Sequence, residues 1–210
     1  MTTATLPRHR NRFGVSVPRL WPSETFVCVA SGPSLTEEDV LLCASREVRI
    51  VAVKDAIRLV PAGSVDALYA CDAKWWRHHK PTYEGLRYSI EPGAAEYATV
   101  LRNTGDRGLE TDPSGLRTGR NSGYQAVNLA VHLGAARVIL LGYDMGDQAG
   151  KDHWFGRHPY PAMRPPYQIF REFFPSIVEP LKALGVEVIN ASRRTALDCF
   201  PRVRLEEALP

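Results

Sequence analysis

The chain has 210 residues, of which 44% are hydrophobic and 23% are charged, with a formal net charge of +3. These proportions are typical of a globular protein and exclude wholesale disorder. A net charge this small gives no reason to expect specific binding to nucleic acid, and no apolar run reaches the length of about eighteen residues that a membrane span needs. The length suits one domain, or one domain with an inserted lid.

The first residues and the cysteines bear on where the protein acts. The N-terminal segment has no hydrophobic stretch of the kind found in secretory signals, so we expect a cytoplasmic protein. The cysteines are widely spaced, without a C-x-x-C pair that would indicate a metal site, and they are typical of small core residues in a reducing compartment. The four are Cys28, Cys43, Cys71 and Cys199.

Residues 1–22 are predicted to form a flexible basic arm before a single domain over residues 23–210. The arm carries a cluster of basic residues, which suits either anion binding or a frayed terminus, and we expect the frayed terminus. Within the domain, residues 145–166 or so are predicted to form a lid. The basic cluster consists of Arg8, His9, Arg10 and Arg12.

The first predicted strand, Phe26–Ala30, leads through a turn of small residues into a helix from Thr36 to about Ala44. In the turn, Ser34 is the expected N-cap, with Glu37 as its capping-box partner. Free N–H groups and the helix dipole at such a turn attract anions, although a tight turn also needs glycine and serine for its geometry alone. The turn matches neither G-x-G-x-x-G nor a Walker loop.

Polar residues follow the next predicted strands. Arg49–Val53 is followed by a lysine and an aspartate, and Asp66–Cys71 by an aspartate. Because parallel strands end at one edge of a sheet, these side chains are predicted to gather in a crevice there. The pair Trp75-Trp76 suits stacking on a base or sugar ring, or packing. The crevice residues are Lys54, Asp55, Asp72 and, from a later strand, Asp144.

Between Lys80 and Gly119 the hydrophobic pattern is weak. Short apolar pieces near Tyr88–Ile90 and Thr99–Leu101 are candidate strands. The glycine-rich segment Asn103–Arg120 is predicted to be a long loop, and loops of that length are often functional.

The stretch Asn121–Asp144 is predicted to be a helix followed directly by a buried strand. Ser122 is the expected N-cap and Gln125 completes a capping box, while Gly134 lies where a glycine ends a helix. The unbroken apolar run Val138–Leu141 is typical of a parallel strand covered on both faces. A carboxylate then emerges at the end of the strand, where ligands bind in open α/β sheets.

The segment Gly146–Pro159 is a polar loop that can close over a ligand at this edge. Its histidines, His153 and His158, suit general acid–base catalysis, and its cations, Lys151 and Arg157, suit phosphate contacts. A histidine base near its ordinary pKa of about 6.5 predicts activity that rises through neutral pH. His-x4-His without nearby cysteine or glutamate is a poor match to zinc spacing, and plain solvation of a mobile loop is the alternative explanation of the same charges.

The rest of the pattern completes a fold class. Tyr167–Leu184 is predicted to be a helix that Pro175 and Pro180 kink or split, and Val186–Asn190 is the last predicted strand. The alternation of strands and helices predicts a doubly wound α/β domain with a mostly parallel sheet. The polar crevice and the anion-friendly turns favour a nucleotide-like ligand.

Two ordered motifs resemble known families. S-G-P-S-L after the first strand, with N-S-G-Y-Q-A and L-G-A-A-R-V-I-L-L-G-Y-D-M further on, resembles the bacterial CMP-sialic-acid-dependent sialyltransferases. The same set resembles the MptE-like proteins, whose characterised archaeal members are 6-hydroxymethyl-dihydropterin diphosphokinases, and small phage and prophage members of that wider group. The resemblance covers roughly Phe26–Asn190 and implies a Rossmann-like nucleotide-binding core.

The resemblance also implies site residues. The sialyltransferases carry a catalytic histidine in the lid after their G-I-D-F strand, and His153 and His158 stand in that segment here. The chain departs from these enzymes where Asp55 replaces their asparagine, and where the short lid reads H-W-F-G-R-H-P. By motif position, the nucleotide contacts implied are Ser31, Gly32, Pro33, Ser34, Asn121, Ser122, Gly123 and Asp144.

Three functions are open at this stage. The first is a transferase that moves a glycosyl group from a nucleotide-sugar to an acceptor that the sequence does not identify, with a lid histidine as base and the two lid cations neutralising the leaving phosphate. The second is an ATP-dependent diphosphokinase acting on a pterin-like hydroxymethyl substrate, in which Asp72 and Asp144 would hold Mg²⁺. The third is a non-catalytic nucleotide-binding phage protein, acting in the cytoplasm of a bacterial host. No tightly bound cofactor is expected.

Overall fold

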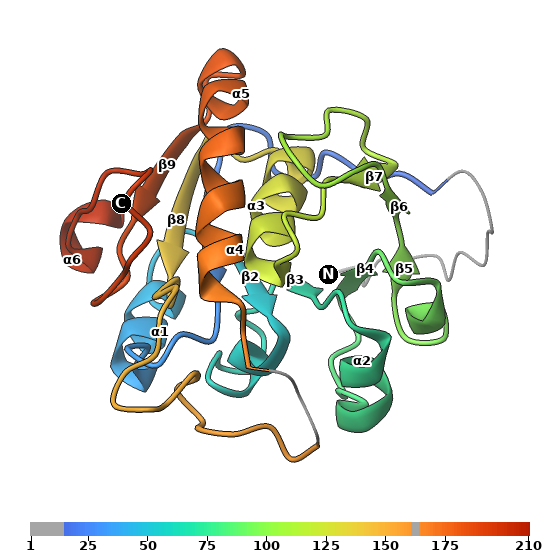
Figure 1. Cartoon of the computed structure of the whole chain (residues 1–210). Coiled ribbons are helices and arrows are strands. Elements are labelled where there is room, and N and C mark those ends of the chain that lie inside the picture. Colours follow the sequence, from blue (N-terminus) through green and yellow to red (C-terminus); the bar gives the residue numbers. More distant parts are fainter. Residues whose placement is uncertain (1–14, 161–163) are drawn as a thin grey trace.

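The structure is built around a seven-stranded sheet in which every neighbouring pair of strands is parallel. The computed structural model describes residues 15–160 and 164–210, so the basic cluster at the start of the chain lies outside the described residues. The strand order is β5-β4-β3-β2-β1-β8-β9 (Figure 1). This is a Rossmann-like doubly wound α/β fold, and its main sheet is parallel throughout. The strands of this sheet are β1 (Thr25–Val29), β2 (Arg49–Val53), β3 (Ala67–Tyr69), β4 (Leu86–Ser89), β5 (Thr99–Val100), β8 (Arg137–Leu141) and β9 (Glu187–Asn190).

The central strands are apolar along their length because both faces of the sheet are covered. In β1, Phe26 and Cys28 belong to the core on one face, whereas Val27 and Val29 belong to the core on the other. All four side chains are fully buried. Burial on both faces therefore accounts for the unbroken apolar runs that predicted these strands.

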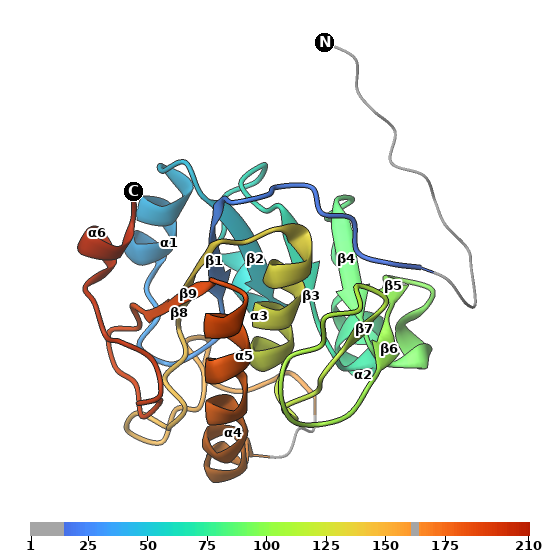
Figure 2. The same ribbon diagram turned by 90° about the horizontal axis from the view of Figure 1, so that it is seen from above.

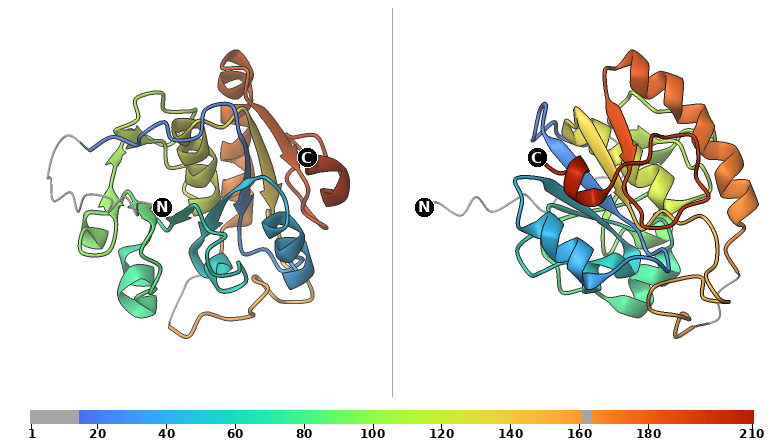
Figure 3. Two further views of the ribbon diagram at one scale, coloured as in Figure 1. Left: turned by 180° about the vertical axis from the view of Figure 1, so that it is seen from behind. Right: turned by 90° about the vertical axis from the view of Figure 1, so that its left-hand side faces the viewer.

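Helices cover the two faces of the sheet as separate layers. Val40 of α1 and Trp75 of α2 belong to the core on one face, and Leu129 of α3 and Leu181 of α5 to the core on the other. Figures 2 and 3 show α1 and α6 on one side of the sheet and α3, α4 and α5 on the opposite side. The helices are α1 (Glu37–Ala44), α2 (Ala73–His79), α3 (Ser122–Leu133), α4 (Tyr167–Phe173), α5 (Val178–Ala183) and α6 (Leu205–Ala208).

The order of the strands reverses next to β1. The chain runs from β1 outward to β5, returns through α3, and places β8 on the other side of β1. Ligands of open α/β sheets bind at the carboxyl ends of the strands beside such a reversal. Residues 145–160 of the predicted lid, which follows β8, run near these ends in Figure 1.

The N-cap of helix α3 lies one residue before the predicted one. Its N-cap is Asn121, whose Oδ1 accepts a hydrogen bond from the Tyr124 N–H at 3.1 Å. Ser122 is the first helical residue, so its prediction as N-cap was wrong, and Gln125 completes no capping box because its amide binds elsewhere. Asparagine and serine cap equally well, so adjacent candidates cannot be separated by residue type. Gly134 ends the helix with a φ of 122°, as predicted.

The helix α1 shows the same kind of shift. Thr36 is its N-cap, with its Oγ1 accepting a hydrogen bond from the Asp39 N–H at 3.2 Å. The prediction of Ser34 as N-cap was wrong, because the Ser34 hydroxyl instead accepts a hydrogen bond from the Arg194 N–H at 3.2 Å. The turn between β1 and α1 is therefore fastened to the loop that follows β9.

Asn121→Ala is expected to lower the free energy of unfolding by about 1 kcal/mol, because the Tyr124 N–H loses its acceptor. Ser122→Ala is the matched control on the neighbouring residue, since its hydroxyl accepts only one longer bond, from the Cys71 N–H at 3.3 Å. Urea denaturation of both variants measures the difference. A larger loss in Ser122→Ala than in Asn121→Ala would contradict the assignment of the cap.

Two further segments can be compared with their predictions. The predicted helix over Tyr167–Leu184 is split, because a 3₁₀ turn over Phe174–Ile177, with Pro175 in it, separates α4 from α5. Proline lacks the N–H that a continuous helix needs, so the predicted interruption is confirmed. The weakly patterned segment holds four strands. β4 and β5 of the main sheet lie at the two candidate strands, whereas the predicted loop over Asn103–Arg120 also contributes to a second, two-stranded parallel sheet of β6 (Arg102–Asn103) and β7 (Gly115–Leu116).

The described part of the predicted N-terminal arm packs against the domain. Val17 is buried and its N–H donates to the Pro113 carbonyl at 2.8 Å, and the Trp21 N–H donates to the Leu133 carbonyl at 2.9 Å. These contacts hold residues 15–22 close to α3. Within residues 15–160 and 164–210, no helix is long and apolar enough to cross a membrane.

Candidate functional site

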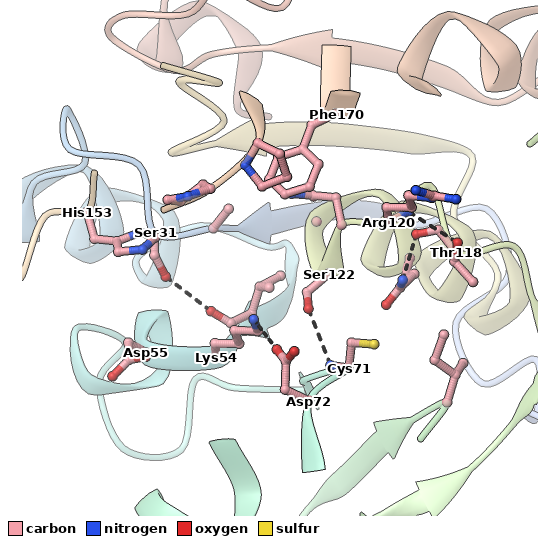
Figure 4. A pocket seen from close by; sticks show the side chains of 18 of the residues that line it. Ser31, Lys54, Asp55, Cys71, Asp72, Thr118, Arg120, Ser122, His153 and Phe170 are labelled. Atoms are coloured by element: carbon pink, nitrogen blue, oxygen red, sulfur yellow. Dashed lines mark hydrogen bonds and ion pairs between the residues drawn. The ribbon is translucent and has the colours of Figure 1, made fainter. Parts of the chain in front are cut away.

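A cavity of about 1340 Å³ opens at the carboxyl ends of β1, β2, β3 and β8, beside the reversal of strand order. Most small-molecule sites enclose roughly 300–1,000 Å³, so this cavity has room for two ligands or for one large ligand. Figure 4 shows part of its lining: Lys54, Cys71 and Asp72, here called the cavity floor, and Ser122 at the start of α3, which belongs to one wall. The structure brings together most of the residues predicted for the site, and the following line the cavity: Ser31, Gly32, Pro33, Lys54, Asp55, Asp72, Asn121, Ser122, Gly123, Asp144, His153 and His158.

Three of the predicted site residues are not among the residues that line the cavity: Ser34, Lys151 and Arg157. Lys151 and Arg157 are exposed. Ser34 is engaged through both its N–H and its hydroxyl. The arrangement therefore gives no support to the two lid cations as neutralisers of a leaving phosphate.

The turn between β1 and α1, predicted to bind an anion, is filled by the protein itself. The Gly32 N–H donates to the Gly142 carbonyl, the Ser34 N–H to the Asp144 carboxylate, both at 2.8 Å, and the Leu35 N–H to the Gly32 carbonyl at 3.1 Å. Because these amides already have acceptors, the turn offers few free N–H groups to a phosphate. In addition, the first turn of α1 carries three acidic residues, Glu37, Glu38 and Asp39, which repel anions.

Asp144 acts as an internal anion in this turn. The residue is buried, and its Oδ1 is one of the described buried side-chain atoms that have no hydrogen-bond partner. Burial raises the pKa of the Asp144 carboxyl, and the hydrogen bonds from Ser34 oppose that shift. The carboxylate therefore ties the end of β8 to the turn after β1.

Asp55 is likewise held by protein groups. Its side chain is almost completely buried, and the Trp75 Nε1–H donates to one carboxylate oxygen at 2.9 Å. Arg58 and His79 lie 3.4 Å and 3.6 Å from the other oxygen. Asp55 thus anchors the 3₁₀ turn after β2 to α2.

The tryptophan pair is part of the core. Trp75 and Trp76 are both buried, and the Trp76 Nε1–H donates to the Ala70 carbonyl at 2.9 Å. Stacking on a ligand, one of the two roles considered for the pair, is excluded by this burial, because neither ring face reaches the cavity.

Lys54 and Asp72 form an ion pair on the cavity floor (Figure 4). Lys54 directly follows β2 and has a φ of 53°, a left-handed conformation that is uncommon for residues with a side chain. Asp72 is at the N-cap position of α2, yet its side chain caps nothing. The Glu91 carboxylate accepts from the Ala73 N–H at 2.6 Å in its place. Asp72 is thereby free to face the cavity.

The first turn of α3 forms the wall beside Asp72. The Ser122 hydroxyl accepts a hydrogen bond from the Cys71 N–H, which links α3 to the end of β3 (Figure 4). The Gln125 Oε1 accepts a hydrogen bond from the Tyr69 hydroxyl at 2.7 Å, and the Gln125 Nε2–H donates to the Thr118 carbonyl at 2.6 Å. These bonds fix the position of the helix start relative to the cavity floor.

One cysteine lies at the site. All four cysteines are free, and Cys28 and Cys43 are buried core residues as predicted. Cys71 differs from them because it lines the cavity and is only partly buried. Burial, and next the neighbouring Asp72, raise the pKa of the Cys71 thiol to about 12, so the thiol stays protonated at neutral pH and is a poor nucleophile.

The lid is attached to the domain at a few points. The Trp154 N–H donates to the Ser31 carbonyl at 3.2 Å, and the Arg58 guanidinium lies over the rings of Trp154 and Phe155 at 5.2 Å and 5.7 Å. The Tyr167 hydroxyl donates to the Asp152 carbonyl at 2.9 Å. Trp154 and Phe155 therefore anchor the lid to the domain.

The two lid histidines belong to a stack of rings. His153 stacks on Phe155 with ring centroids 5.0 Å apart, and His158 stacks on Tyr160 at 5.1 Å. Burial, and next Lys54, lower the pKa of His153, while burial, and next His153, lower the pKa of His158 to about 4. The prediction that these histidines keep an ordinary pKa was therefore wrong. Both are neutral at pH 7, and the Nδ1 of His158 has no hydrogen-bond partner.

Several residues that line the cavity carried no signal in the sequence. Phe170 of α4 lies across the pocket from Asp72 in Figure 4, where an aromatic face can cover a planar ligand. The spacing of Tyr167 and Phe170, three apart on a helix, places both on one face and was the only available hint. Other lining residues outside the predicted set include Lys74, Glu91, Arg102, Asn103, Ser114, Thr118, Arg120, Gln125, Asp152, Tyr160 and Arg164.

Metal binding has limited support in the described residues. Among them, no group of three or more histidine, cysteine or acidic side chains is arranged to hold a metal ion. Asp72 is paired with Lys54, and Asp144 accepts from the Ser34 N–H, so each carboxylate proposed for Mg²⁺ has a partner within the protein.

Fold and cavity together define a doubly wound α/β protein with a large ligand site beside the reversal of its strand order. Comparisons of the chain with protein-family models, with curated proteins and with solved structures gave no match.

Proposed function

We propose that the protein is a nucleotide-dependent transferase that moves a glycosyl group from a nucleotide-sugar to an acceptor hydroxyl. The observation that carries this proposal is the cavity itself, which lies beside the reversal of strand order and is large enough for a donor and an acceptor together. The ordered motifs around Ser31–Leu35 and Asn121–Asp144 add support, because both contribute residues to this cavity.

The donor is expected to lie between α4 and the cavity floor. Phe170 offers an aromatic face for the base, and the first turn of α3, with Ser122 and Gly123, offers polar groups close to the floor. The lid covers the other side of the cavity with His153 and His158. Closing a cavity of this kind excludes water, which would otherwise compete with the acceptor.

The transfer needs a base and a leaving group. One lid histidine, neutral at pH 7, removes the proton of the acceptor hydroxyl as the acceptor oxygen bonds to the anomeric carbon. The bond between that carbon and the phosphate oxygen breaks, and the nucleotide phosphate leaves with the electron pair. The proton stays on the imidazole until solvent takes it.

Titration calorimetry with CMP, UDP, GDP and ATP, with and without Mg²⁺, tests the proposal. At least one pyrimidine or purine nucleotide is expected to bind without a requirement for Mg²⁺. Phe170→Ala is expected to weaken that binding by about tenfold, as the loss of base stacking predicts. Gln168→Ala, an exposed position on the same helix that does not line the cavity, is the control.

The other outcomes of this test are also informative. Binding of ATP only with Mg²⁺ would favour the diphosphokinase over the glycosyltransferase. Binding without turnover of any donor and acceptor pair would favour a non-catalytic nucleotide-binding protein. Absence of binding to every nucleotide would overturn the proposal.

A further inference from the structure

The cations that line the cavity differ in where their acidic partners lie. Arg102 pairs with Asp112 and Arg120 pairs with Asp106, and neither of these acids is among the cavity-lining residues. These pairs hold the arginines to the wall. Lys54 differs from these two arginines, because its partner Asp72 faces the cavity as well. Arg164 also has a cavity-lining partner, Asp152, but its side chain is 66% exposed, whereas that of Lys54 is 28% exposed.

The Lys54–Asp72 pair is also partly open to solvent. The Lys54 side chain is 28% exposed, whereas the Asp72 side chain is 47% exposed. An ion pair this exposed contributes little free energy. A carboxylate with this much exposure can also be rehydrated when it separates from the lysine ammonium. The lysine, by contrast, stays on the cavity floor.

Two local features of the chain favour this pair at a cost to the regular structure. Lys54 has a left-handed backbone conformation, which L residues rarely adopt and which is often found at functional positions. Asp72 leaves its helix uncapped, although aspartate is among the best N-cap residues, and Glu91 takes over that role. Both departures direct a charged group toward the same point in the cavity.

We propose that Lys54 is the phosphate-binding residue of this site and that Asp72 occupies it until a phosphate arrives. The ligand's phosphate oxygen replaces the Asp72 carboxylate at the Lys54 ammonium, and the carboxylate turns toward the open part of the cavity. This inference deepens the proposed function, since it names the residue that would receive the nucleotide's phosphate. It also moves the anion site from the turn after β1, where Asp144 fills the space, to the end of β2.

The proposal predicts effects of opposite sign for the two residues. Asp72→Asn removes the competing carboxylate, so it is expected to strengthen binding of inorganic pyrophosphate and of a nucleoside diphosphate by about threefold. Lys54→Asn keeps a residue that tolerates the left-handed conformation but lacks the charge, and it is expected to weaken binding by about tenfold or more. In the Lys54→Asn background, Asp72→Asn is expected to bring no gain, because the two residues act as one unit.

Calorimetry with pyrophosphate and with CDP, UDP and ADP, in buffer free of divalent metal, measures these constants. Arg46→Gln, an exposed cation away from the cavity, controls for the change in net charge. Weaker binding in Asp72→Asn, or unchanged binding in Lys54→Asn, would overturn the inference. Nucleotide binding without the opposite signs would leave the proposed function standing and remove this inference. If the two variants change pyrophosphate binding in opposite directions but nucleotides bind no better than pyrophosphate, this inference stands and the proposed function is removed. Absence of binding to pyrophosphate and to every nucleotide would overturn both proposals.

Discussion

Gly32→Ala is expected to lower the free energy of unfolding by about 3 kcal/mol or more, the largest stability effect that we predict for a cavity residue. A Cβ at residue 32 would lie 2.0 Å from the Asp144 Oδ1 and 2.5 Å from the Gly142 carbonyl oxygen. The carbonyl belongs to the backbone and cannot move aside without shifting the end of β8. Asp144 can move only by giving up its bond to the Ser34 N–H.

Urea denaturation followed by far-UV circular dichroism measures this effect. Gly146→Ala is the matched control, because a Cβ there has only the Asp144 carbonyl oxygen near it, at 4.0 Å, and its φ is not positive. Asp144→Ala combined with Gly32→Ala is expected to recover part of the loss, since one of the two clashes is then absent. A Gly32→Ala protein as stable as Gly146→Ala would contradict the contact between Gly32 and Asp144.

Much of the sheet could be predicted from the sequence because its strands are buried on both faces. The apolar run Arg49–Val53 predicts β2 at both ends, and Val138–Leu141 predicts β8 to within one residue. A strand covered on both faces leaves an unbroken apolar signal, and a following polar residue marks its end. The reversal of strand order could not be predicted in this way, because no local pattern says on which side of β1 the chain returns.

The candidate site shows where such prediction fails. The S-G-P-S-L turn has the composition of an anion site, but an aspartate 110 residues away in the chain fills it. Side chains that compete for a site from distant segments are invisible to local motifs. The left-handed backbone of Lys54 is equally unexpected, because lysine has no preference for that conformation and only the surrounding structure imposes it.

The lid contains an unusual share of the unsatisfied polar atoms. Within the described residues, eight buried side-chain atoms lack a hydrogen-bond partner, and four of them belong to the lid. Buried polar atoms without hydrogen bonds are costly, although one of these four, Asp152 Oδ1, has an ion-pair neighbour in the Arg164 Nε at 3.5 Å. The lid is therefore expected to gain hydrogen bonds when a ligand or water enters the cavity. The four are Gln148 Oε1, Asp152 Oδ1, Trp154 Nε1 and His158 Nδ1.

If the proposed function holds, replacement of the lid histidine that acts as the base by asparagine is expected to lower kcat by about 10²–10⁴-fold, with nucleotide affinity retained. His153→Asn and His158→Asn are compared in steady-state assays with the donor identified by calorimetry, and His78→Asn, an exposed histidine that does not line the cavity, is the control. A large loss in one lid variant assigns the base. Near-normal rates in both would remove histidine from the mechanism and leave the metal-dependent diphosphokinase as the better explanation.

The pH dependence of kcat/KM gives an independent check on the same residues. A histidine acts as a base only when neutral, and burial lowers the pKa of both lid histidines, that of His158 to about 4. In the unfolded chain these histidines bind a proton near pH 6.5, whereas in the folded lid they do not. Lowering the pH below about 6.5 therefore lowers the free energy of unfolding, and at still lower pH the neutral form that acts as base is lost as well. We therefore expect kcat/KM to be constant from pH 7 to 8 and to fall only below about 6.5, with the midpoint close to pH 4 if His158 is the base. A midpoint of this fall at about pH 6.5 or above, lost in one of the two variants, would contradict the lowered pKa and restore an ordinary, solvent-exposed histidine.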